Sequence, residues 1–195
     1  MNKHISTQYD ADLDAIRSNL TRMGGMVEEQ VRAAMTAFAE NDLDLVGQIV
    51  SRDRDIDAME LTIDDACTNL IARRQPTAID LRTVMAVGKT VTDLERIGDE
   101  AKKIAKTTRK ILERGMSESI AKTLDIRNIG DQTANMLRIV LDAFVRLDTE
   151  AATGIVRQDK EIDQQFRATV RQLVTFMMED ARTISTALDI IFIAK

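Results

Sequence analysis

Acidic side chains are the residues of this chain whose type and spacing could do chemistry, and that chemistry would be metal binding. Asp53, Asp57, Glu60 and Asp64 fall within about 60° of one another around a helix of 3.6 residues per turn, so they form one line of carboxylates. Hard cations prefer several carboxylate oxygens, and acids on two neighbouring helices can supply them. The spacing alone decides little, because 32 acidic residues in 195 give about five pairs at i and i+4 by chance and the chain has six.

Glu95 and Asp99 form a second pair of acids, one helical turn apart. They continue the line of Val84, Gly88 and Val91, which predicts that they point toward a groove between helices more than toward open water. Gly88 leaves space beside that groove. The spacing leaves two interpretations open, a metal site shared by two helices and an acidic face that is simply solvated.

Other catalytic chemistry has little support in the residues. The only histidine, His4, is expected to lie before the first helix, so no Ser or Cys of the helical region has a histidine base to pair with. Oxygen chemistry at paired metals in helical bundles uses Glu-x-x-His ligands, which a single histidine does not provide. We therefore predict that the protein is not an enzyme. A carboxylate-bridged metalloenzyme and a ligand-free structural helical protein remain as alternatives.

The composition is typical of long packed helices. The chain has one proline, eight glycines, five phenylalanines, one tyrosine and no tryptophan. Its net charge of −5 is spread along the sequence without a basic block, which argues against nucleic acid as a partner. No segment approaches the roughly 18 apolar residues of a membrane span, and the single thiol, Cys67, fits a reducing compartment. We therefore expect a cytoplasmic protein that does not span a membrane.

The chain contains an internal repeat. Shifted by 106 residues, the segment 31–57 aligns with 137–163 without a gap, and nine of the 27 positions are identical, where chance gives about two. Other aligned pairs keep apolar character, such as Met35 and Leu141. The identical pairs are Arg32/Arg138, Ala37/Ala143, Phe38/Phe144, Asp42/Asp148, Ile49/Ile155, Val50/Val156, Asp53/Asp159, Ile56/Ile162 and Asp57/Asp163.

Each copy of the repeat divides into three amphipathic helices. In the first copy, apolar stripes at helical spacing run through residues 16–38, 45–70 and 81–105. Three such helices joined by short turns bury their stripes best against one another. We therefore predict an all-α fold of two tandem three-helix bundles, residues 1–115 and 116–195, with six long helices.

Turn residues predict where the helices begin and end. Asn41 and Asp42 offer an N-cap for the second helix, and the third is expected to end near Arg114 and Gly115. The third helix aligns with the end of the chain at a spacing of 103, so the sixth helix is expected to be truncated. In the second copy we expect helices over 117–147, over 148–179 and from about residue 183 onward.

One stretch of the third helix carries a resemblance to a known family. Residues 92–105 read T-D-L-E-R-I-G-D-E-A-K-K-I-A, and the chain enters that helix with A-R-R-Q-P at 72–76 and D-L-R at 80–82. The L-E-R-I-G-D core resembles the signature of the PhoU family, in which acidic residues bind metal ions on the bundle surface. Together with the repeat, the resemblance covers essentially the whole chain.

The resemblance implies a ligand, a site and partners. Glu95 and Asp99 would bind a divalent or trivalent metal ion such as iron, zinc, manganese or magnesium, with Asp57, Glu60 and Asp64 facing them from the second helix. The protein would be a negative regulator of the phosphate-starvation response and would modulate phosphate transport, acting in signal transduction and phosphate homeostasis. Its partners would be the sensor histidine kinase of that response and the ATPase subunit of the phosphate ABC importer. A homodimer is expected.

Two departures from the family pattern weaken the second copy as a metal site. Its own L-E-R-I-G-D motif would begin just past Lys195, so the chain is expected to be short at its C-terminus relative to the family. The fifth helix keeps Asp159 and Asp163 but has Phe166 and Val170 at the next two positions of the acidic line. We therefore expect the metal site in the first copy.

Overall fold

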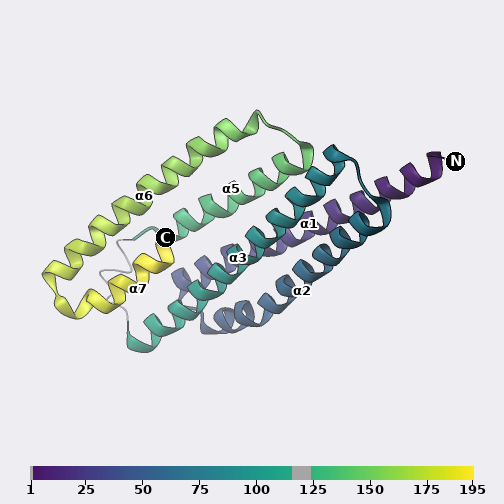
Figure 1. Ribbon diagram of the computed structural model, residues 1–195. Helices are drawn as coiled ribbons and strands as arrows, with labels where there is room; N and C mark the ends of the chain where they lie inside the picture. The colour runs from purple at the N-terminus through teal and green to yellow at the C-terminus, as the bar shows by residue number, and fades with distance from the viewer. Residues whose placement is uncertain (1, 116–123) are drawn as a thin grey trace.

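The computed structural model describes residues 2–115 and 124–195, and all regular structure in those two ranges is helical. This confirms the predicted all-α fold. Figure 1 shows an elongated bundle in which long helices run side by side. Within the described ranges, no helix is both long enough and apolar enough to cross a lipid bilayer. In chain order the elements are α1 (Asn2–Glu40), α2 (Leu43–Arg74), α3 (Ala78–Arg114), α5 (Ile126–Arg146), α6 (Ala151–Glu179), the 3₁₀ turn η1 (Ala181–Thr183) and α7 (Ile184–Ala194).

Two helix ends of the first half lie where the sequence predicts them. The carboxylate of Asp42 accepts a hydrogen bond from the N–H of Leu45 at 2.9 Å and caps α2. Gly115 follows the last residue of α3 with a φ of +85°, a conformation that glycine adopts without steric cost. These local signals fix the lengths of α2 and α3, the two helices that carry the acidic lines.

Other helix starts differ from the prediction. His4 lies inside α1 and not before it, because the helix begins many residues before the first buried residue of its apolar stripe. Helix α6 begins at Ala151 and not at residue 148, because the Asp148 carboxylate accepts a hydrogen bond from the Ala151 N–H at 3.2 Å. Helix α5 begins at Ile126. The predicted start at residue 117 lies outside the described residues.

Helices α1, α2 and α3 pack against one another along their lengths and bury most of the predicted stripes (Figure 1). Leu81, the first residue of the stripe predicted for the third helix, is exposed and was wrongly predicted as buried. Leu20, Met23 and Val27 of α1 are fully buried, as are Ile63 of α2 and Val91 of α3. Burying a side chain of this size stabilises the fold by about 1.5 to 3 kcal/mol relative to leaving it in water. The apolar core of the first half therefore holds α2 and α3 side by side in a fixed arrangement.

Helix α5 packs on α1 and joins the two halves of the chain. A Cβ added to Gly24 of α1 would overlap Leu141 Cδ1, and a Cβ added to Gly130 of α5 would lie 2.9 Å from Met35 Sδ and 3.0 Å from Met35 Cβ. Leu141 and Met35 thus fill notches that only glycine leaves open. Gly24 and Gly130 are 106 residues apart, and so are Met35 and Leu141. The two contacts are therefore equivalent under the repeat, which confirms the repeat in three dimensions.

The apolar cores of the two halves are continuous. Leu141 of α5 belongs to the core of α1, α2 and α3, whereas Met35 and Ile111 of the first half belong to the cluster of Leu173 and Ile190. The predicted boundary between residues 115 and 116 falls at the edge of the segment 116–123, which lies outside the described residues. The division into two domains at that point stays a prediction.

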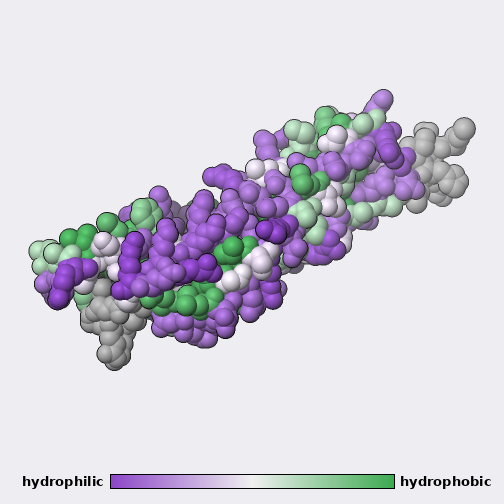
Figure 2. Space-filling model, turned by 90° about the horizontal axis from the view of Figure 1, so that it is seen from below, coloured by the Kyte–Doolittle hydropathy of each residue, from purple (hydrophilic) through white to green (hydrophobic). Residues whose placement is uncertain are grey.

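Helix α6 is more exposed than α2, its counterpart in the repeat. The 37 residues of α3 cover α2, whereas α7 has 11 residues. Within α6, Thr169 and Leu173 are the buried residues. Met178, near the end of α6, and Phe192, near the end of α7, are 83% and 71% exposed. Apolar atoms are also visible at the end of the molecule where α6 turns into α7 (Figure 2). The sixth helix of the prediction is therefore present and short.

Candidate metal centre

The acidic residues predicted as ligands lie on two helices, Asp57, Glu60 and Asp64 on α2 and Glu95 and Asp99 on α3. Glu60 is on α2, and the pKa of its carboxyl is raised above the usual value by burial first and then by the negative charges of Glu95, Asp64 and Asp57. Because Glu95 is on α3, this repulsion acts between the helices as well as along α2. Charges perturb a carboxyl in this way at short range. Glu60 of α2 therefore lies within electrostatic range of Glu95 of α3.

Glu95 lies at the centre of this group. Burial raises the pKa of its carboxyl, the charges of Asp99, Asp57 and Asp53 raise it further, and the charge of Lys102 lowers it. Glu95 and Asp99 are half-buried, and the orientation predicted for the pair, toward a groove between helices, stays a prediction. Of the predicted site residues, Glu60, Glu95 and Asp99 are half-buried, and Asp57 and Asp64 are exposed.

Asp53, the first residue of the predicted carboxylate line, is buried and pairs with a lysine that the sequence did not single out. The side chain of Asp53 is 3% exposed and accepts a hydrogen bond from Lys102 Nζ. The same ammonium donates to Asp99 Oδ1 at 3.3 Å. The hydrogen bond with Asp53 is the largest cause of a raised Lys102 pKa, so the lysine stays charged. The only sequence signal that Lys102 contacts these acids is its spacing of three residues from Asp99 on α3.

Gln30 of α1 holds Asp53 in place. Its Nε2 donates to Asp53 Oδ1 at 3.1 Å and to the Gly98 carbonyl at 3.1 Å, so one amide links all three helices of the first half. Gly98 lets Ile56 of α2 pack closely against α3, because a Cβ there would lie only 3.2 Å from Ile56 Cδ1. The glycine of the L-E-R-I-G-D core therefore serves packing, while its neighbouring acids line the groove.

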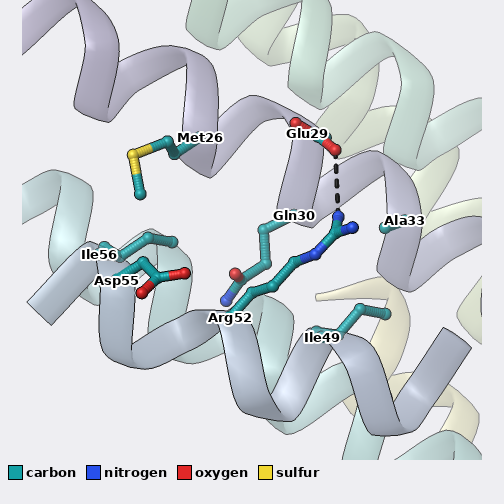
Figure 3. A pocket seen from close by; sticks show the side chains of 8 residues that line it. All are labelled: Met26, Glu29, Gln30, Ala33, Ile49, Arg52, Asp55 and Ile56. Carbon is teal, nitrogen blue, oxygen red and sulfur yellow. Dashed lines mark hydrogen bonds and ion pairs between the residues drawn. The ribbon is translucent and has the colours of Figure 1, made fainter.

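A hollow of about 320 Å³ lies between α1 and α2, and Gln30 is one of its walls. Figure 3 shows Arg52 reaching from α2 to Glu29 on α1, with a distance of 3.1 Å between Arg52 Nη1 and Glu29 Oε1. Apolar side chains and Asp55 complete the lining. Gln30 lines the hollow and also donates the hydrogen bond to Asp53, so the hollow lies beside that contact.

The predicted ligands offer suitable donors for a hard cation without converging on one point. Among residues 2–115 and 124–195, no three Asp, Glu, His or Cys side chains stand together in an arrangement that could hold a metal ion. The donor set still fits such an ion chemically, because carboxylates supply the oxygen ligands that hard cations take. The Lys102 ammonium already pairs with Asp53 and Asp99, so a positive charge is favourable beside these acids. A metal ion would have to draw the carboxylates together. Metal binding by these residues stays a prediction.

The equivalent acids of the second half are placed differently. Asp159 and Asp163 are exposed on α6, and Asp163 lies 3.7 Å from Arg167 of the same helix. Phe166, which replaces a carboxylate of the line, packs against the apolar cluster of the second half. The acidic group of α2 and α3 therefore has no full counterpart on the described part of the second half.

Replacing Glu95 with glutamine should stabilise the metal-free protein at neutral pH but not in acid. The folded state raises the pKa of Glu95, so it binds this proton more tightly than the unfolded chain does. The free energy of unfolding therefore falls as the pH rises from the ordinary glutamate value through the raised one, and the neutral amide removes this loss. Urea unfolding should show a gain of about 0.5 kcal/mol at neutral pH, the size usual for partly exposed charges.

The control for this prediction is Glu113→Gln, which removes a carboxylate from the exposed last turns of α3. Its effect on the free energy of unfolding should be the same at neutral pH and in acid, whereas the effect of Glu95→Gln should differ between the two. The same gain for Glu95→Gln at neutral pH and below the ordinary glutamate pKa would contradict the explanation by charge repulsion.

Comparison with known families places this arrangement among related proteins. The family model described as the PhoU domain matches residues 20–108 and, a second time, residues 126–195. The two matches follow the internal repeat, one on each half of the chain.

Individual relatives agree with the family match. The chain is 46% identical over 195 residues to the phosphate-specific transport system accessory protein PhoU of Escherichia coli (strain K12), covering 100% of this chain and 80% of that protein. It is 47% identical over 189 residues to a homolog of that accessory protein from Pseudomonas putida, covering 97% of this chain and 73% of the homolog.

Solved structures share the fold. The crystal structure of PhoU from Pseudomonas aeruginosa matches with a TM-score of 0.88 at 42% identity, over 95% of this chain and 88% of that one. The phosphate transport system regulatory protein PhoU from Streptococcus pneumoniae matches with a TM-score of 0.83 at 26% identity, over 95% and 86% of the two chains.

Proposed function

The chain belongs to the PhoU family, and from this premise we propose that it is a cytoplasmic regulatory adaptor and not an enzyme. It would restrain the phosphate-starvation response when phosphate is plentiful and modulate phosphate import. The observation that carries the proposal is its similarity, over its full length, to an accessory protein of the phosphate-specific transport system. The match of the family model to both halves supports the same conclusion.

The proposed partners are the sensor histidine kinase of the phosphate response and the ATPase subunit of the phosphate ABC importer. An adaptor controls such partners by differential binding, because a surface that fits one conformation of the partner increases the population of that conformation. The long helices of the first half offer rigid surfaces for this purpose, since their apolar faces are already buried against one another. Self-association into a homodimer is part of the proposal, and light scattering on the purified protein would test it.

A metal ion in the acidic groove is the second part of the proposal. Glu95 and Asp99 of α3 would be its ligands, with Asp57, Glu60 and Asp64 contributing from α2. A divalent or trivalent ion, such as iron, zinc, manganese or magnesium, would supply positive charge and relieve the repulsion that raises the pKa of Glu60 and Glu95. The proposed role of the ion is therefore structural, in fixing the surface that α2 and α3 present to partners.

Retention of purified partners tests the adaptor function directly. The full chain is immobilised and exposed separately to the importer ATPase subunit and to the cytoplasmic part of the sensor kinase, and we expect both to be retained. A reporter of the phosphate-starvation response, placed in cells that lack their own PhoU, should be repressed when this chain is expressed in phosphate-rich medium. Retention of neither partner, together with an unrepressed reporter, would refute the proposal.

A matched pair of variants separates the groove from the rest of the surface. Glu95→Ala with Asp99→Ala removes the two strongest ligand candidates, whereas Asp159→Ala with Asp163→Ala removes the equivalent spacing from the exposed face of α6. We expect the first pair to weaken retention and the second pair to leave it unchanged. If both pairs retain the partners as the wild type does, the acidic groove has no part in adaptor function.

A further inference from the structure

The hollow between α1 and α2 holds a hydrogen-bond acceptor that no described residue uses. Gln30 is 6% exposed, and its Nε2 donates to Asp53 Oδ1 and to the Gly98 carbonyl. Both partners are acceptors, so they fix the orientation of the amide and leave Oε1 as a free acceptor on its other side. Among the described residues, the Tyr9 hydroxyl is the one fully buried side-chain polar group without a partner. Gln30 Oε1 is therefore unpartnered but open to the hollow that its side chain lines.

The other polar groups of the hollow are mostly acceptors too. Figure 3 shows the oxygen end of the Gln30 amide turned toward Asp55 and Met26, whereas Arg52 turns the other way and reaches Glu29. Asp55 is exposed and forms no ion pair within the described part of the chain. The lining has two carboxylates and one guanidinium, which gives a net charge of −1. A ligand that fits these groups must therefore supply hydrogen-bond donors and positive charge.

We propose that the hollow binds an arginine side chain of a partner protein. The guanidinium would donate to Gln30 Oε1 and to the Asp55 carboxylate, and its methylene groups would lie against Met26 and Ile56. A guanidinium suits acceptors on two helices better than an ammonium does, because it carries five N–H donors in one plane and is less strongly hydrated. The inference rests on the proposed adaptor function only for the source of the arginine, and it involves no metal ion.

The size and the opening of the hollow favour a single side chain. Its volume of about 320 Å³ is at the small end of the range usual for ligand sites, about 300 to 1,000 Å³. The side chains of Glu29 and Arg52 are 72% and 54% exposed, so a partner can reach the hollow from the surface. Water can satisfy Gln30 Oε1 in the free protein, and a ligand without a donor would displace that water and leave the acceptor unpaired. The hollow should therefore prefer a basic side chain to an apolar one.

Titration of the full chain with N-acetyl-arginine methylamide, followed by NMR of ¹³C-labelled methionine methyl groups, tests the site. We expect the Met26 methyl signal, assigned with Met26→Leu, to shift as the compound binds. The neutral isostere N-acetyl-citrulline methylamide should bind about tenfold more weakly, because it lacks the charge. Asp55→Asn should weaken arginine binding about tenfold, whereas Asp65→Asn, which alters an exposed carboxylate of α2 outside the hollow, should change it by less than about twofold.

Retention of the purified partners identifies the source of the arginine. Asp55→Asn should weaken the retention of the importer ATPase subunit or of the sensor kinase about tenfold, and Asp65→Asn should leave both unchanged. If the arginine compound binds no more tightly than its neutral isostere, or binds Asp55→Asn as it binds the wild type, the site is refuted. If it binds as expected but Asp55→Asn retains both partners as the wild type does, a partner arginine is refuted as the occupant. If the wild type retains neither partner, the adaptor function fails, and the titration still decides the site.

Discussion

Gly130→Val should lower the free energy of unfolding by about 3 kcal/mol, the upper part of the range usual for overpacking a core. A Cβ at this position would lie 2.9 Å from Met35 Sδ and 3.0 Å from Met35 Cβ, before the two methyl groups of valine are added. Met35 is 6% exposed and has little room to move away. Urea unfolding followed by circular dichroism measures the loss.

Two further variants identify the cause of that loss. Gly154→Val places the same side chain on α6 where a Cβ meets no atom within 4 Å, and it should change stability by less than about 0.5 kcal/mol. In a chain that already carries Met35→Ala, Gly130→Val should cost less than about 1 kcal/mol, because the notch is then empty. Strictly additive effects of the two substitutions would show that Met35 is not the group that the new side chain meets.

Removing the buried carboxylate of α2 should have a comparable effect. Asp53→Ala leaves the amide of Gln30 and the ammonium of Lys102 without their shared acceptor, and we expect a loss of about 3 kcal/mol. The value lies at the lower end for a broken buried ion pair, because the Lys102 side chain is 26% exposed and can turn to water. The free energy of unfolding in urea checks the prediction.

The control for this second prediction is Asp65→Ala, which removes an exposed carboxylate from the same helix and should cost less than about 0.5 kcal/mol. Asp53→Asn keeps an acceptor for Gln30 and should fall between the two. A loss for Asp53→Ala no larger than that for Asp65→Ala would show that the contacts with Gln30 and Lys102 contribute nothing to stability.

The apolar stripes of the first half could be predicted because helix periodicity and burial follow directly from the sequence. Residues such as Ile16, Leu20 and Val27 recur every three or four positions, and all of them are buried. The cap at Asp42 and the stop at Gly115 are equally local signals, each fixed by one side chain or one backbone conformation. The acidic residues of α2 and α3 could be placed on their helices for the same reason, since they continue the edges of buried stripes.

Contacts between distant segments could not be predicted in this way. The repeat aligns Met35 with Leu141, but nothing in the alignment says that each fills a notch in the other half. The sequence does not single out Lys102 or Gln30, because long polar side chains are common on helices. Only the packing of α1, α2 and α3 brings both side chains to Asp53. The acidic site was thus predictable as a line of charges, whereas its internal cation and its support from α1 were not.

The reciprocal packing of α1 and α5 has a mechanical consequence. The two anchored points, Gly24 with Leu141 and Gly130 with Met35, are 11 residues apart on each helix, or about 16 Å along its axis. One anchored point would let the halves pivot about it, but two points this far apart resist rotation and sliding alike. The contact between α1 and α5 should therefore be rigid. We expect any regulatory motion to occur elsewhere in the molecule than at this contact.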